Sequence, residues 1–280
     1  MSEDSCKSGN PSANGLDAII VKNSLAKIKN KLVVMSGKGG VGKSTVAVNL
    51  AMALAMDGYS VGLLDVDLHG PSVPKMLKLE DEVPMATAEQ RMIPVSFGGL
   101  KVMSVGFLLR DPDEAVIWRG PVKMGVIKQF ITDVEWGELD YLVVDAPPGT
   151  GDEPLTICQL LGNEAGAIIV TSPQQVAAVD VSKSLNFCCQ LEMPVAGIIE
   201  NMSGFVCPHC GEVTDIFSSG AGEQLAAKYG VELLGKIPVD PMICRDGDAG
   251  TPFIHHDAKT PTGRAFAAIV EKIAGRETAV

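Results

Sequence analysis

A glycine-rich run that contains two lysines carries the strongest chemical signal in the sequence. It comes after the apolar segment LVVM, precedes a stretch with helical periodicity, and matches the pattern G-x-x-x-x-G-K-[ST]. Glycines let backbone N–H groups face phosphate oxygens, and the dipole of the following helix adds positive charge. The sequence therefore predicts a loop that binds the phosphates of a nucleotide. The predicted nucleotide-binding residues of this loop are Gly37, Lys38, Gly39, Gly40, Val41, Gly42, Lys43, Ser44 and Thr45.

Two side chains of this loop have roles that derive from the chemistry of the motif. The Lys43 ammonium is expected to reach the β- and γ-phosphates, and the Ser44 hydroxyl is expected to ligate Mg²⁺. Lys38 is an additional cation that the minimal motif does not require. A loop lysine in this position either acts on the nucleotide or is simply solvated.

The segment GKGGVGKST is similar to the deviant Walker A loop of an ATPase family that includes nitrogenase iron protein, the septum-site ATPase of the Min system and plasmid-partition ATPases. In that family the extra lysine reaches across a dimer to the ATP of the partner, much as an arginine finger supplies charge in trans. The resemblance implies catalytic roles for Lys38 and Lys43, bound ATP with Mg²⁺, slow hydrolysis that works as a switch, and a homodimer.

Carboxylates come after two further apolar runs, where an ATPase needs them for Mg²⁺ and for the attacking water. Asp67 comes just after the run 59–65 and resembles the water-activating aspartate of this family, while Asp65 alternates to the same face and is a candidate to support either Mg²⁺ or the loop. Asp145 ends the run YLVVD and, with Gly149, resembles Walker B and switch II. The resemblance implies that Asp145 holds Mg²⁺ through a water and that the Gly149 amide senses the γ-phosphate. A helix N-cap is the alternative for a single aspartate after an apolar run.

A candidate adenine site lies in the C-terminal half of the chain. Asn201 comes after the apolar run 195–200, and its side-chain amide offers both a donor and an acceptor to an adenine edge. The family has an adenine-reading asparagine after this strand. Pro238 and Asp240 belong to a turn that resembles the second base-contacting segment of the family. An asparagine that only forms a turn is the alternative for Asn201.

Cys207 and Cys210 form a C-x-x-C pair, a spacing that suits a metal, a redox disulfide or an iron–sulfur cluster. One pair supplies two ligands, whereas tetrahedral zinc and a cubane cluster each take about four. The remaining cysteines do not repeat the spacing. A two-fold dimer would bring two such pairs together and complete a four-thiolate site.

The motifs DVDLHGPS, WRGP, DAPPGTGDEP and ENMSGFVCPHCG, taken with the phosphate loop, resemble the Mrp/Nbp35 family (ApbC in bacteria) of iron–sulfur cluster carrier ATPases over residues 30–275. The resemblance implies that Cys207 and Cys210 bind a bridging [4Fe-4S] cluster across the dimer. It also implies transfer to apo-proteins and contact with a cluster-assembly scaffold. The segment CPHCG is equally half of a zinc ribbon, so a zinc-bridged regulatory ATPase is an alternative.

The elements that must position these residues are visible as alternating apolar and amphipathic runs. Runs such as YLVVD and GAIIVT do not alternate with polar residues, which is typical of strands covered on both faces. We predict a single α/β domain of the P-loop NTPase class, with a mostly parallel sheet flanked by helices on both faces. Residues 1–15 are predicted to be a disordered tail and residues 16–280 the ATPase domain, with the metal-binding loop at 203–215. The run VSFGGLKVMSV predicts a β-hairpin that turns at Gly98 and Gly99.

Composition limits the classes of function. The 280 residues carry a formal charge of −11, and 46% are hydrophobic whereas 20% are charged. An acidic chain disfavours nucleic acid and anionic membranes, so we expect neither as a partner. A positioning ATPase of the Min or partition type, which would use one of them, is the alternative function. Seven cysteines, no secretory leader and no apolar run of about 18 residues together predict a cytoplasmic protein.

Overall fold

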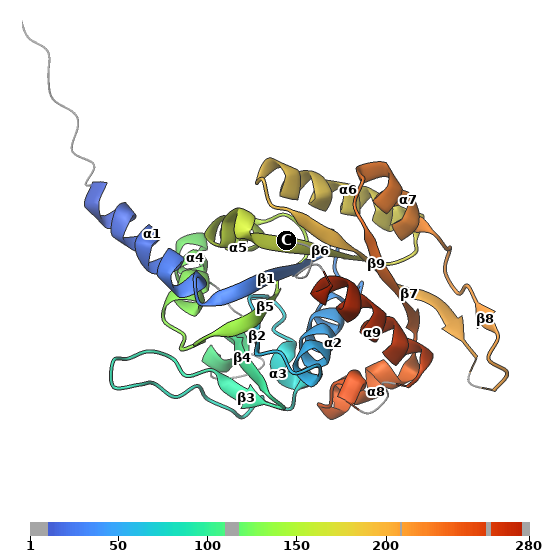
Figure 1. The fold of residues 1–280 in the computed structure, drawn as a ribbon, viewed down its shortest axis with the longest axis horizontal. Helices are drawn as coiled ribbons and strands as arrows, with labels where there is room; N and C mark the ends of the chain where they lie inside the picture. Colours follow the sequence, from blue (N-terminus) through green and yellow to red (C-terminus); the bar gives the residue numbers. More distant parts are fainter. Residues whose placement is uncertain (1–10, 110–117, 208, 256–258, 276–280) are drawn as a thin grey trace, which may run out of the picture.

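The computed structural model describes residues 11–109, 118–207, 209–255 and 259–275. These residues form a nine-stranded sheet in the order β3-β4-β2-β5-β1-β6-β7-β8, and β9 also pairs with β7 (Figure 1). The pairs that involve β3 and β8 are antiparallel, and the others are parallel. The strands are β1 Ile28–Met35, β2 Val61–Asp65, β3 Val95–Phe97, β4 Leu100–Ser104, β5 Leu139–Asp145, β6 Ala165–Thr171, β7 Val195–Val206, β8 Val213–Thr214 and β9 Leu233–Val239.

Helices cover both faces of the sheet. Figure 1 shows α1, α4, α5, α6 and α7 on one face and α2, α3, α8 and α9 on the other. The helices are α1 Pro11–Leu25, α2 Lys43–Met56, α3 Val73–Met76, α4 Gly120–Thr132, α5 Asp152–Leu161, α6 Gln175–Gln190, α7 Ala221–Tyr229, α8 Pro241–Ala249 and α9 Pro261–Ala274. This arrangement confirms the predicted fold class.

The central strands are apolar because both of their faces lie in the core. The last five residues of β1 and of β5 are all buried, as continuous apolar runs between two helical layers should be. Helix α2 packs on the sheet with buried residues around most of its circumference, which explains its uniformly apolar sequence.

Strand register brings the predicted carboxylates to one edge of the sheet. Asp65 of β2 pairs with Asp145 of β5, and Asp145 in turn pairs with Val34 of β1, just before the phosphate loop. Asp65 also faces Ser104 at the end of β4. Parallel strands end at the same level, so residues far apart in the sequence meet at the carboxyl edge.

Two local predictions, the hairpin and the N-terminal tail, can be compared with the structure. Strands β3 and β4 form the expected hairpin, with positive φ at Gly98 and Gly99. Helix α1 includes residues 11–15, which we expected in the irregular tail. Pro11 occupies its first position, where the fixed φ of proline suits a helix and no N–H is needed. Residues 1–10 of the predicted tail lie outside the described residues.

Strand β7 is longer than the predicted run 195–200, because it continues through Asn201 to Val206. The expected metal-binding loop at 203–215 is therefore largely a hairpin made by the end of β7 and by β8. Among the described residues, no helix has both the length and the apolar character needed to cross a membrane.

Candidate functional site

The phosphate loop joins β1 to α2 and leaves an open space above the N-terminus of that helix. Gly40 and Gly42 have φ of 78° and 81°, which only glycine adopts freely. A Cβ atom added at Gly39 or Gly40 would meet nothing within 4 Å, and no side chain caps the first turn of α2. Gly37 differs, because a Cβ there would lie 2.3 Å from the backbone carbon of Asp180 on α6. The loop is thus an open cradle of N–H groups, tightly anchored at its first glycine.

Lys43 lies at the centre of the charged part of the site. Its Nζ atom is 2.5 Å from Asp145 Oδ1 and 3.7 Å from Asp67 Oδ2, and the residue is 6% exposed. The same Nζ lies 3.2 Å from the Ser44 hydroxyl. The other carboxylate oxygen of Asp145, Oδ2, is buried and has no hydrogen-bond partner among the described residues. The structure therefore brings the predicted Lys43, Ser44, Asp67 and Asp145 together.

Asp65 holds the loop that comes after β2. Its carboxylate accepts hydrogen bonds from the Asp67 N–H, the Val73 N–H and the Ser104 hydroxyl. Burial and the neighbouring Asp145 charge raise the pKa of Asp65 to about 8. Burial also raises the pKa of Asp145, against the lowering effect of the Lys43 ammonium. Asp65 therefore positions Asp67, and the hypothesis that it supports the loop fits these contacts.

Two predicted nucleotide contacts are engaged within the chain. The Gly149 N–H, expected to sense the γ-phosphate, donates to the Ser36 carbonyl at 2.8 Å. The Lys38 ammonium donates to Gln174 Oε1, just before α6, at 3.2 Å. The Gly149 amide has one N–H and must leave Ser36 before it contacts a phosphate, whereas the Lys38 ammonium has two further N–H donors.

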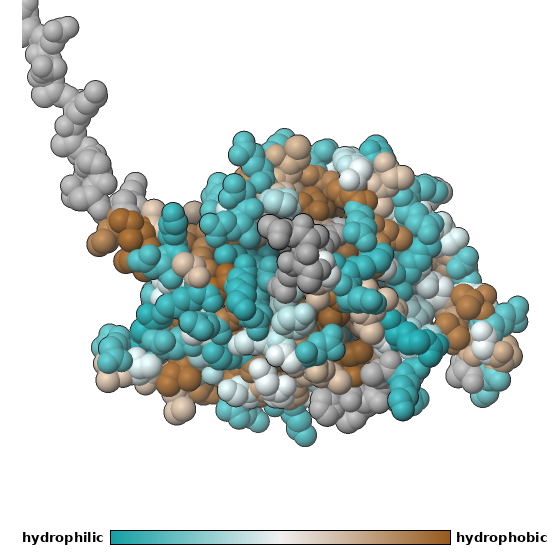
Figure 2. Space-filling view, viewed as in Figure 1, coloured by the Kyte–Doolittle hydropathy of each residue, from teal (hydrophilic) through white to brown (hydrophobic). Residues whose placement is uncertain are grey.

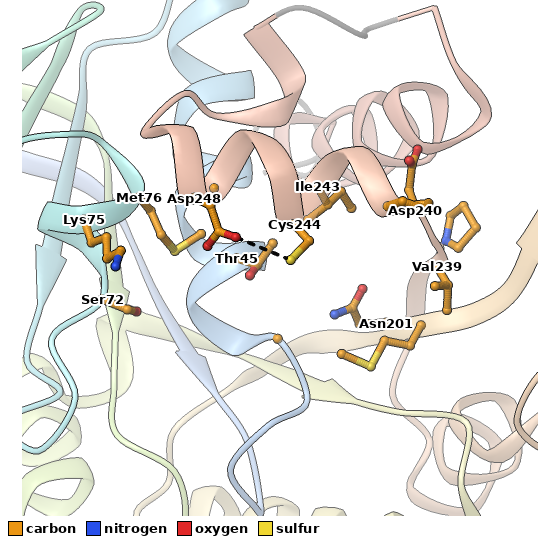
Figure 3. Close-up of a pocket in the computed structure, with 15 residues that line it drawn as sticks. Thr45, Ser72, Lys75, Met76, Asn201, Val239, Asp240, Ile243, Cys244 and Asp248 are labelled. Atoms are coloured by element: carbon orange, nitrogen blue, oxygen red, sulfur yellow. Dashed lines mark hydrogen bonds between the residues drawn. The ribbon is translucent and has the colours of Figure 1, made fainter.

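An elongated cavity of about 510 Å³ continues from the phosphate loop. Figure 3 shows Asn201 and Val239 on one side of it, Lys75 and Met76 of α3 on the other, and Cys244 and Asp248 of α8 between them. The predicted residues that line it are Gly42, Thr45, Asn201, Pro238 and Asp240. Its size and mostly apolar wall suit a nucleoside.

Two of the predicted base-contacting residues also have structural roles. Asn201 Nδ2 donates to the Val41 carbonyl at 2.8 Å, so this side chain supports the phosphate loop. Asp240 caps α8 by accepting from the Met242 N–H, and it accepts a second hydrogen bond from the Thr262 hydroxyl. The helix N-cap that we considered for single aspartates thus applies to Asp240 rather than to Asp67 or Asp145.

Cys207 and Cys210 lie at the tip of the β7–β8 hairpin, at the right of Figure 1. The hairpin closes by hydrogen bonds from the Cys207 N–H to the Glu212 carbonyl and from the Gly211 N–H to the Cys207 carbonyl. The backbone N–H groups of Cys210 and His209 donate to the Cys207 sulfur and lower its pKa. Both thiols are accessible, and no cluster of three or more metal-ligating side chains occurs in the described part of the chain.

Sequence reasoning missed several residues of the site. Lys75 and Cys244 line the cavity beside the phosphate loop but occur in segments without a motif, and Met202, which also lines it, was not singled out within the motif ENMSGFVCPHCG. A link between the loop that carries Asp67 and the start of α5 was also missed: Lys123 Nζ lies 2.9 Å from His69 Nε2 and 2.7 Å from Glu153 Oε1. Partial burial works to raise the pKa of Glu153, yet the hydrogen bond and charge of Lys123 lower it overall. Only the fold shows that these elements converge.

The parallel sheet, the open glycine cradle and the lysine–carboxylate cluster at its edge define a P-loop nucleotide-binding protein. A family model described as NUBPL iron-transfer P-loop NTPase, of the ParA type, matches residues 27–274. The chain belongs to this family of iron–sulfur cluster carriers and assembly factors, which confirms the resemblance inferred from the motifs.

Three similar proteins place the chain within the family. An iron-sulfur cluster carrier protein of Methanocaldococcus jannaschii is 51% identical over 92% of this chain and 89% of its own. The cytosolic Fe-S cluster assembly factor NUBP2 of Bos taurus is 46% identical over 92% of this chain and 97% of its own. A nucleotide-binding protein of Archaeoglobus fulgidus, solved with ADP, has a TM-score of 0.77 at 41% identity and covers 89% and 96% of the two chains.

Proposed function

We propose that the protein is a dimeric ATPase that holds a bridging [4Fe-4S] cluster and transfers it to apo-proteins. The observation that carries the proposal is the accessible pair Cys207 and Cys210 at a hairpin tip, which offers half of the ligands that a cubane cluster takes. A two-fold axis beside this tip would join two pairs into one four-thiolate site.

The surface around the thiols supports a dimer. Val213, Ile216 and Phe217 are 65%, 53% and 36% exposed, and they lie soon after the thiol pair in the chain. Figure 2 shows hydrophobic residues gathered over the β7–β8 hairpin. Exposed apolar groups next to a half-formed metal site favour contact with a second copy, which would cover both.

ATP with Mg²⁺ fits the site of the phosphate loop. The partnerless buried oxygen of Asp145 lies beside Lys43, and the glycine cradle has room for phosphates. Ser44 would ligate the cation directly, and Asp145 would hold it through a water. When bound, Mg²⁺ neutralises charge that develops on the phosphate oxygens.

Different residues of the chain have separate roles in hydrolysis. Lys43 moves from Asp145 to the β- and γ-phosphates, while Asp67, held by its N–H to Asp65, orients the attacking water. Lys38 leaves Gln174 and reaches the nucleotide of the partner subunit. When the Gly149 N–H is released from the Ser36 carbonyl, it can donate a hydrogen bond to the γ-phosphate, and its position then depends on whether that phosphate is present.

Anaerobic reconstitution tests the cluster assignment. We expect roughly four iron and four sulfide ions per two chains, with a dimeric mass in sedimentation. Cys207→Ala and Cys210→Ala should each abolish this loading, whereas Cys189→Ala, which removes an exposed thiol on α6, should leave it unchanged. Iron that fails to bind, that persists in both variants, or that is displaced entirely by zinc would contradict the proposal.

We place this activity in the cytoplasm, with apo iron–sulfur proteins and a cluster-assembly scaffold as partners. The cytosolic naming of the bovine relative supports that placement. A positioning role would require binding to DNA or to membranes. Co-sedimentation of the ATP-loaded protein with DNA or anionic vesicles would favour that alternative instead.

A further inference from the structure

Strand β7 belongs to both functional regions of the molecule. Asn201, in its middle, lines the cavity beside the phosphate loop, and the strand continues to Val206, immediately before Cys207. The backbone between the nucleotide cavity and the thiols is therefore only a few residues long and lies within this one strand. Any change in its dihedral angles redirects the hairpin that carries the thiols.

The cavity end of this segment is packed closely against the phosphate loop. Asn201 Nδ2 donates to the Val41 carbonyl at 2.8 Å. A Cβ atom added at Gly42 would lie 2.2 Å from Asn201 Nδ2 and 3.9 Å from Met202 Cε. Asn201 and Met202 both line the cavity, so a bound nucleoside would contact both side chains.

The backbone is unusual directly after Asn201. Met202 has a φ of 58°, in the left-handed region that a residue with a Cβ rarely adopts, and Gly204 has a φ of 75°. Asn201 pairs with Ile237 and Phe205 with Val239, so this part of β7 contains more residues than the facing part of β9. An irregularity of this kind bends a strand and changes the direction of the residues beyond it.

The two sides of the bend are held unequally. Upstream, the buried Glu200 accepts a hydrogen bond of 2.6 Å from the Gly222 N–H of α7, and it also accepts one of 2.6 Å from the Ser203 hydroxyl within the bend. Downstream, the strand pairs with the two residues of β8 and, at Phe205 alone, with Val239 at the end of β9, and the side chain of Val213 is largely exposed. A rotation at the bend would therefore move the hairpin and leave the body of the sheet in place.

We propose that Met202 is a further nucleotide-contacting residue and that residues 202–204, the β7 joint, couple nucleotide occupancy to the direction of the thiol hairpin. A nucleoside packed on the Met202 side chain holds its backbone in the left-handed state. When the cavity empties, Met202 relaxes toward extended dihedral angles and the hairpin becomes free to change direction. This inference rests on the proposed binding of nucleotide in the cavity, but it requires neither hydrolysis nor a cluster.

Hydrogen exchange of metal-free, reduced full-length protein tests the coupling. ADP is used as the probe, because it fills the cavity without the γ-phosphate contacts that would close a dimer. Saturating Mg-ADP should slow amide exchange of residues 203–214 by about threefold or more. Met202→Gly should lose this slowing, because it removes the side chain that contacts the nucleoside and the preference of a residue with a Cβ for extended dihedral angles. Met202→Leu should keep the slowing.

Two further variants separate the joint from general effects. Gly204→Ala leaves the residues that line the cavity unchanged but penalises the positive φ of the joint, so it should reduce the slowing at saturating ADP. Glu192→Gly is the control, because it removes the backbone strain of a left-handed residue, with a φ of 54°, that lies outside the joint. Its exchange should match that of the parent protein. ADP that binds without changing the exchange of the hairpin, or full slowing in Met202→Gly, would overturn the inference. Failure of ADP to bind the parent protein would instead remove the proposed function.

Discussion

Asp65 illustrates how one residue can have a role that its motif does not reveal. Its position beside Asp67 in the sequence is compatible with Mg²⁺ binding, but its contacts are those of an anchor for the loop. In that role the carboxyl group of Asp65 is buried near that of Asp145, and its pKa is raised to about 8. The native state therefore holds a proton at pH values where the unfolded chain has lost it.

We expect Asp65→Asn to change how stability depends on pH. A folded pKa of about 8 against an ordinary value of 3.8 means that the contribution of Asp65 is full below pH 4 and is lost as the pH rises toward 8. Asparagine does not titrate, so the free energy of unfolding of the parent should fall relative to the variant by roughly 2–4 kcal/mol between pH 5 and pH 8. Urea denaturation of nucleotide-free protein across this range measures the difference. Parallel pH profiles for the two proteins would contradict it.

A second prediction concerns the thiolate of Cys207. Because backbone N–H groups at the hairpin tip lower its pKa, alkylation of Cys207 should begin at a lower pH in the folded protein than in urea. His209→Pro removes one of these N–H donors and should shift the profile to higher pH, whereas His209→Ala keeps the donor and should not. Mass spectrometry of the alkylated peptide monitors the reaction. A profile that is the same in folded and unfolded protein would exclude the hydrogen-bond explanation.

Single elements show where sequence patterns are sufficient and where they are not. Buried strands such as β5 and the hairpin of β3 and β4 could be predicted, because a continuous apolar run or a Gly-Gly turn is a local signal. The extension of β7 to Val206 could not, because its last residues are held by pairing with β8 and β9, which the local pattern does not encode. The motifs, which are local patterns, identified Lys43 and Asp145. The roles of Asp65 and Met202 could not be identified in this way, because they depend on neighbours from other strands.

The contact between β9 and α9 depends on a glycine that no motif identifies. A Cβ atom at Gly235 would lie 2.5 Å from Ile269 Cγ1, so Gly235→Ala should overpack the core and cost about 1–3 kcal/mol. Ile269→Ala alone should cost about 2–4 kcal/mol through the cavity it leaves. The double variant should be more stable than the sum predicts, because the new methyl group enters the vacated space.

Gly125→Ala on α4 is the matched control for this experiment. An added Cβ there meets nothing within 4 Å, so it should stabilise the protein by about 0.5–1 kcal/mol through helix propensity. Chemical denaturation curves give all four values. Strict additivity of the two core substitutions would show that β9 and α9 do not pack as described.

On the scale of the whole molecule, the net negative charge does not show where the cationic side chains lie. The chain carries a formal charge of −11, yet Lys38, Lys43 and Lys75 all lie around the phosphate loop and its cavity. Carboxylates of Asp67, Asp145, Asp240 and Asp248 lie beside these cations, so the site suits a small anion that binds together with a divalent cation rather than an extended polyanion such as DNA. Composition alone predicts which partners are disfavoured, but it cannot locate these cations.

We expect a non-hydrolysable ATP analogue with Mg²⁺ to shift the protein toward a dimer. Lys38→Ala should bind ADP with an affinity within about twofold of the parent, because the proposed contact of Lys38 is with the nucleotide of the other subunit. It should nevertheless remain mostly monomeric with the analogue. Lys43→Ala is the comparison that loses binding itself. Analytical ultracentrifugation distinguishes these cases, and a dimer of undiminished stability in Lys38→Ala would contradict a role in trans.

The position of β1 between β5 and β6 also sets an order of events during synthesis. β1 leads into the phosphate loop, yet its two neighbours in the sheet end at Asp145 and Thr171. Parallel strands pair only after the connections between them have been made, and such long-range pairing is slow. A nascent chain therefore presents β1 without a partner until Asp145 has left the ribosome, and with one open edge until Thr171 has followed. The ability to bind nucleotide arises late, and a chain truncated earlier carries the loop without a site and with a strand prone to aggregate.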